Sequence, residues 1–126
     1  MMARTVRLGA LLALLVVAAC DSGPSGPGAL VVRVSGPSLG GALIDVSGSG
    51  IRGFAGRGST QAYGASVGAG GAAHRVLLID PNGTEMVFEI LVAELGMEGP
   101  TLTVVSATGV NNSTQLVSGV AVLVER

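Results

Sequence analysis

The chain has 126 residues, of which 48% are hydrophobic and 12% are charged, and its formal net charge is −1. The length fits one main domain, and the apolar content excludes a polar disordered chain. The chain has seven arginines and no lysine, and they form no basic cluster. This excludes the positive footprint that nucleic-acid binding needs, and a single cysteine excludes an internal disulfide.

The N-terminus has the organisation of a secretory signal. Arg4 and Arg7 make the first residues basic, and residues 8–19 form an uninterrupted apolar run that ends at Cys20. A basic start, a short apolar stretch and small residues before a cut define such a signal. Twelve helical residues rise only about 18 Å, whereas the hydrocarbon core of a membrane is roughly 30 Å thick. We therefore interpret residues 1–19 as a cleaved signal helix rather than a membrane span.

The last residues of this segment refine the interpretation. Val17-Ala18-Ala19-Cys20 resembles the lipobox of bacterial lipoproteins, in which a branched apolar residue and two small residues precede cysteine. The resemblance implies that a signal peptidase cuts between Ala19 and Cys20, and that Cys20 carries the lipid. It also implies a membrane-anchored protein of the bacterial cell envelope, facing the periplasm or the cell exterior. An ordinary secretory signal with a chance cysteine is the alternative.

A tether follows the predicted lipidation site. Residues 21–28 read DSGPSGPG and contain no large apolar side chain to bury. Pro24 and Pro27 also remove backbone donors. We predict that residues 20–28 are the lipidated cysteine and a flexible to semi-extended linker, and that the folded domain comprises residues 29–126.

The rest of the chain predicts strands. Short runs rich in Val, Ile and Leu alternate with turn residues, and no long helical period is present. The expected strands cover residues 29–34, 42–47, 51–54, 75–79, 101–107 and 116–125. This pattern indicates an all-β fold, a small antiparallel β-sandwich.

Residues 85–95 are ambiguous. As a strand they would place Met86, Phe88, Ile90 and Val92 on one face; as a helix they would end at a Gly96 cap. The density of Val, Phe and Ile and the preceding Asn-Gly turn favour the strand.

Two further segments have unusual compositions. Residues 116–124 are apolar on both faces, which predicts a central strand, a strand covered on both sides, or a contact surface. Residues 53–71 contain seven glycines and predict a loop around a poor strand near residues 59–65.

No arrangement of residues points to catalysis. His74 is the only histidine, and the sequence has no Gly-x-Ser-x-Gly motif to place a nucleophile beside it. Asp80, Asn82 and Glu85 resemble the start of a calcium loop, but Glu85 and Leu91 stand where the EF-hand pattern needs Gly and Glu. Asp-Pro-Asn-Gly is also a strong turn by itself. We expect no catalytic residue, no metal and no cofactor.

The spacing of the first two strands and the Val-rich final strand are similar to cohesin-like and immunoglobulin-like surface domains, a likeness of fold that carries no site residues. Our interpretation is a membrane-anchored, non-enzymatic structural or protein-interaction module with a protein partner in the envelope. The alternative is a ligand- or carbohydrate-binding module that uses the glycine-rich 53–71 loop. The three aromatic residues of the chain give little material for a sugar-stacking platform.

Overall fold

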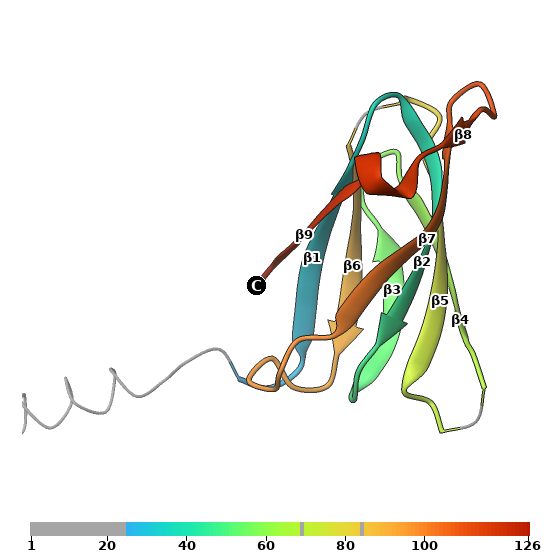
Figure 1. Cartoon of the computed structure of the whole chain (residues 1–126). Helices are drawn as coiled ribbons and strands as arrows, with labels where there is room; N and C mark the ends of the chain where they lie inside the picture. Colours follow the sequence, from blue (N-terminus) through green and yellow to red (C-terminus); the bar gives the residue numbers. More distant parts are fainter. Residues whose placement is uncertain (1–24, 69, 84) are drawn as a thin grey trace, which may run out of the picture.

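A computed structural model describes residues 25–126 except Ala69 and Thr84. Within this range the fold is an all-β sandwich of two antiparallel sheets, as the sequence predicts (Figure 1). The predicted signal helix, the cleavage site at Ala19 and the lipidation site Cys20 lie outside the described residues.

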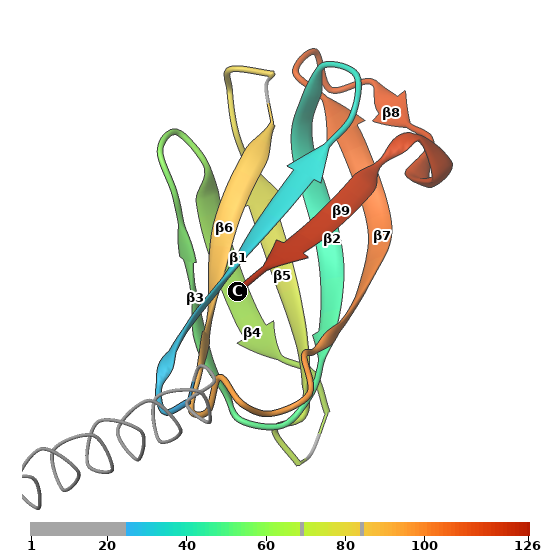
Figure 2. The ribbon, with the colours of Figure 1, turned by 90° about the vertical axis from the view of Figure 1, so that its left-hand side faces the viewer.

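The two sheets share the strands almost equally, and Figure 2 shows them as separate layers. Sheet A has the order β3 (Ile51–Gly56), β6 (Met86–Val92), β1 (Gly28–Ser35) and β9 (Ala121–Glu125). Sheet B has the order β4 (Gln61–Ser66), β5 (Ala73–Ile79), β2 (Leu39–Ser47), β7 (Thr101–Gly109) and β8 (Thr114–Gln115). A short 3-10 helix, η1 (Val117–Gly119), precedes β9.

The core lies between the sheets and follows the two-residue period of the strands. In β1 and β2 alternate residues are buried, while their neighbours are partly exposed. In β6 the buried residues are Met86, Phe88, Ile90 and Val92. This confirms the strand prediction for the ambiguous segment, including the face it buries.

In the predicted loop at 53–71, the poor strand expected near residues 59–65 is present as β4, and β3 extends through Gly56 where a loop was expected. The segment consists mainly of β3 and β4, which are joined by a tight turn that crosses from sheet A to sheet B. Its glycines allow close packing: a Cβ at Gly64 would overlap the ring of Phe54, and one at Gly56 would overlap the carbonyl oxygen of Thr60. Gly56 and Gly64 therefore reflect contact between neighbouring segments, whereas Gly58, Gly68, Gly70 and Gly71 have positive φ angles and no atom within 4 Å of a Cβ position.

The predicted long strand at 116–125 is also corrected. Only Ala121–Glu125 form a strand, because η1 occupies residues 117–119 and Leu116 precedes it. This strand is not central, since β9 is at the edge of sheet A and pairs with β1 alone. Its mostly exposed side chains agree with a contact surface, the third expectation for this segment.

The domain begins slightly before the predicted boundary. Gly28 already pairs with Val92 as the first residue of β1. The backbone N–H of Gly26 donates a 2.7 Å hydrogen bond to Glu94, and its carbonyl oxygen accepts one from Leu95. The end of the sandwich where β1 starts and β6 ends, here called the base, therefore holds the last residues of the tether (Figure 1). The opposite end is called the tip.

Candidate functional site

His74 makes packing contacts inside the sandwich. It is the second residue of β5 and is half buried between the sheets. Its ring lies edge-on to Phe54, with 5.5 Å between ring centroids, and its Nε2 atom is 3.1 Å from the carbonyl oxygen of Gly71. These contacts fix the ring against an aromatic side chain and the neighbouring loop.

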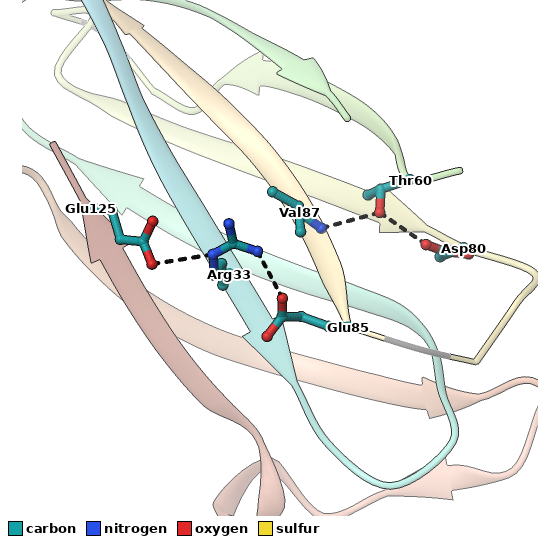
Figure 3. Close-up of polar contacts among 6 residues, drawn as sticks. All are labelled: Arg33, Thr60, Asp80, Glu85, Val87 and Glu125. Carbon is teal, nitrogen blue, oxygen red and sulfur yellow. Dashed lines mark hydrogen bonds and ion pairs between the residues drawn. The ribbon is translucent and has the colours of Figure 1, made fainter. Parts of the chain in front are cut away.

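A buried carboxylate lies at the tip, where β5 ends (Figure 3). Asp80 is only 1% exposed, and it accepts hydrogen bonds from the hydroxyls of Ser59 and Thr60 and from the backbone N–H of Asn82. Thr60 in turn accepts a 3.1 Å hydrogen bond from the N–H of Val87. The cluster ties the β3–β4 turn and the end of β5 to the start of β6, and so links the two sheets.

The same contacts determine the charge state of Asp80. Burial by itself raises the pKa of this carboxyl, but the donors from Asn82, Thr60 and Ser59 outweigh it and hold the pKa below its ordinary value. Asp80 is thus ionised at neutral pH and fully supplied with donors. The hydrogen bonds around the ionised carboxylate therefore hold the β3–β4 turn, the end of β5 and the start of β6 together.

The calcium-like motif does not assemble as a ligand set. Asn82 presents its backbone N–H, not an oxygen, to Asp80, and Glu85 forms a 2.9 Å ion pair with Arg33. Among the residues that the structure describes, no three His, Cys, Asp or Glu side chains are grouped as they would be in a metal site.

The outer face of sheet A is dominated by ion pairs. Arg33 lies between Glu85 at 2.9 Å and Glu125 at 3.1 Å, as Figure 3 shows, and Arg57 pairs with Glu89 at 2.6 Å. These side chains are largely exposed, so each pair adds little to stability. Their effect is to keep this face hydrated.

The outer face of sheet B is different. The register aligns Tyr63, Leu77 and Leu43 across β4, β5 and β2, and Ile79 follows Leu77 on the same face of β5. Tyr63 is 57% exposed, and Leu77 and Ile79 are each exposed by more than two fifths. We call these four residues the apolar patch. The ion pair on this face, Asp45 with Arg75 at 2.7 Å, lies beside the patch toward the base.

A groove of about 440 Å³ extends the patch toward the tip. Leu43, Leu77, Ile79 and Val110 contribute aliphatic walls, and Ser106 and Thr108 add hydroxyl groups. Gly41 leaves the floor bare, because a Cβ there would come within 2.8 Å of the Thr108 hydroxyl. The arrangement suits an uncharged ligand or an apolar protein segment.

The tip also carries exposed apolar side chains. Leu116 is 79% exposed at the start of η1, and Val117 and Val110 are among the other exposed aliphatic residues nearby. A small cavity beneath Leu116 is lined by Pro37, Leu39 and Val120. Apolar exposure is therefore present at the tip as well as on the outer face of sheet B.

Comparison with known proteins finds no relative: no family model, no curated protein and no solved structure matches the chain. Within the described part of the chain, no helix has both the length and the apolar character needed to cross a bilayer.

Sequence reasoning missed the apolar patch and the groove. Both depend on the register that places β4, β5 and β2 side by side, which strand patterns do not specify. A signal was present in residues 75–79, because Leu77 and Leu78 are adjacent and one of them must face outward in any strand.

Proposed function

We propose that this protein is a membrane-anchored lipoprotein of the bacterial cell envelope whose β-sandwich acts as a non-enzymatic protein-interaction module. The observation that supports an interaction module is the contrast between the outer faces of the two sheets. One face carries the ion pairs of Arg33 and Arg57, whereas the other exposes the apolar patch and its groove. A contiguous exposed apolar surface is typical of a contact site.

The anchor rests on the lipobox-like residues that end at Cys20, and the domain geometry suits it. The chain enters the domain at the base, where Glu94 holds the backbone N–H of Gly26. Between Cys20 and Gly26, the five residues 21–25 span up to about 18 Å when fully extended.

Cell fractionation tests the anchor. The wild-type protein is expected in the membrane fraction and to need detergent for release, whereas the Cys20→Ser variant is expected in the soluble envelope fraction. The same location for both chains would contradict lipid anchoring through Cys20.

A matched pair of substitutions tests the interaction module. Leu77 and Leu91 are both leucines of similar exposure, 42% and 38%, on the outer faces of sheet B and sheet A. In detergent extracts, Leu77→Glu is expected to reduce the size of the native complex, because a charge in the apolar patch is costly to desolvate. Leu91→Glu should leave that size unchanged. Equal effects of the two variants would contradict a contact through sheet B.

The groove supports a second candidate, the binding of a small ligand or glycan. Its volume lies within the range of small-molecule sites, and its lining combines aliphatic walls with hydroxyls. A cell-wall polysaccharide extract is then expected to raise the melting temperature of the wild-type protein but not that of Leu43→Glu. An equal shift in both proteins would place binding elsewhere, and no shift in the wild type would count against glycan binding.

A further inference from the structure

Four strand edges end the two sheets, and three of them have features that discourage pairing with another chain. β3 has a register irregularity between Ile51 and Gly53, β4 contains Gly64, and β8 is only two residues long. Bulges, weak strands and very short strands are ways in which proteins protect their sheet edges. These three edges are therefore poor templates for a further strand.

The fourth edge, β9, lacks these features. Ala121–Glu125 is a regular strand without proline, glycine or lysine, and its pairing with β1 shows no register shift. Leu123 is 58% exposed and Val124 is 38% exposed. Among the described residues β1 alone pairs with β9, so the other side of β9 has backbone N–H and C=O groups without a strand partner there, and another extended strand would satisfy them.

The strand is also complementary to itself. Its central residues, Val122-Leu123-Val124, are symmetrical about Leu123. In an antiparallel pair centred on Leu123, each Val122 would oppose the other copy's Val124, and Leu123 would oppose Leu123. Glu125 would oppose Ala121, so that no like charges meet across the pair. Arg33, already bound to Glu125, would remain beside the junction.

We propose that β9 pairs with β9 of a second copy and joins the two A sheets into one continuous sheet. The occupant of the edge is thus another copy of this chain, related by a two-fold axis at Leu123. A five-residue edge contact is small, so the inference rests on the proposed function, in which membrane anchoring raises the effective concentration of the copies.

Disulfide trapping in isolated membranes tests the pairing directly. Leu123→Cys places two thiols opposite each other at a Cα separation of about 4.5–5.5 Å, which a disulfide spans. The matched control is Ala65→Cys, an exposed residue on the β4 edge. Mild oxidation is expected to give a covalent dimer in the first variant and at least about tenfold less in the second. Equal trapping, or none in either, would overturn the proposal.

Oxidation of the unsubstituted chain separates a failure of β9 pairing from a failure of the lipid anchor. Cys20 is its only cysteine, so a dimer of the unsubstituted chain would reveal a free thiol and count against lipidation, not against β9 pairing. Recovery of the Leu123→Cys chain outside the membrane fraction would also contradict the proposed anchor. Absence of trapping in a membrane-bound chain is a failure of the pairing alone.

A charge exchange tests the register. Leu123→Lys and Leu123→Glu each place like charges opposite each other, and each is expected to reduce the dimer about tenfold, as about 1.4 kcal/mol does. Co-expression of the two variants should restore it as a mixed dimer in native mass spectra. Thermal melting checks that both variants stay folded. Loss without restoration in the mixture would contradict the two-fold pairing at Leu123.

Discussion

Asp80 shows how one residue is used at the tip of the sandwich. The sequence suggested a turn or the start of a calcium loop at this position, and the structure surrounds its carboxylate with donors from two segments, the β3–β4 turn and the turn after β5. A buried charge is tolerated when its oxygens are hydrogen-bonded. The interaction is therefore an internal structural contact, with its own dependence on pH.

Because the pKa of Asp80 is lower in the folded chain than in an unfolded one, its stabilising contribution is complete above the unfolded value of about 3.9. The contribution is lost as the pH falls through the lower folded pKa. We predict that Asp80→Asn lowers the free energy of unfolding at pH 7 by about 1–3 kcal/mol. The variant should also lose less stability than the wild type between pH 5 and acid, as measured by urea unfolding at several pH values. Parallel pH profiles would contradict this account.

Gly64 illustrates a close approach that admits no side chain. A Cβ there would overlap the ring of Phe54, whereas a Cβ at Gly119 meets no atom within 4 Å. We predict that Gly64→Ala destabilises the protein by about 1–3 kcal/mol through overpacking, and that Gly119→Ala leaves it nearly unchanged. Thermal melting of the two variants measures the difference. Equal melting temperatures would show that Phe54 moves aside without cost.

At the scale of elements, β6 shows most clearly how the two-residue alternation of a strand separates buried from exposed side chains. Phe88 is fully buried, while Leu91 on the opposite face of the same strand is 38% exposed. We predict that Phe88→Ala costs about 3–5 kcal/mol of stability and that Leu91→Ala costs less than about 1 kcal/mol. Denaturant unfolding of both variants provides the comparison. A large cost at Leu91 would mean that the outer face of β6 is covered.

The sequence predicted the strands whose residues alternate in polarity or that end at clear turns. The prediction was less accurate where glycine can indicate either a loop or a close contact between segments. The run before Ser35-Gly36-Pro37 and the run after Asn82-Gly83 both form strands near their expected positions. Glycines in 53–71 suggested a loop, yet Gly56 permits a close approach to Thr60 across the β3–β4 turn, and Gly64 permits one to Phe54 of the other sheet. Composition cannot separate these meanings, because the distinction depends on which segment packs against the glycine.

The C-terminal segment shows a second limit of sequence patterns. Apolar residues on both faces of 116–124 suggested burial among the possibilities, but β9 is an edge strand whose Leu123 is exposed. A pattern records that side chains are apolar and does not record whether a neighbour in this chain or in another one covers them. The candidate contact surfaces were predictable only in part. The sequence indicated a contact surface as one of three possibilities for residues 116–124, and it did not indicate the apolar patch of sheet B.

At the scale of the whole molecule, the chain combines a predicted anchor with a sandwich whose surfaces are unlike one another. The base receives the tether through Gly26 and Glu94, and sheet A turns ion pairs toward solvent. The apolar patch and its groove lie on the outer face of sheet B, whereas the β9 edge belongs to sheet A. If the proposals above hold, this division lets a tethered domain contact a partner through sheet B and another copy through sheet A.

The central claim is that Cys20 fixes this domain to a membrane, and the intact mass of the protein extracted from membranes tests it most directly. We predict a mass that lacks residues 1–19 and includes acyl chains, and a Cys20→Ser chain without those chains. A chain that retains residues 1–19, or a free thiol on a soluble secreted protein, would contradict the anchor and leave Cys20 as an unmodified cysteine.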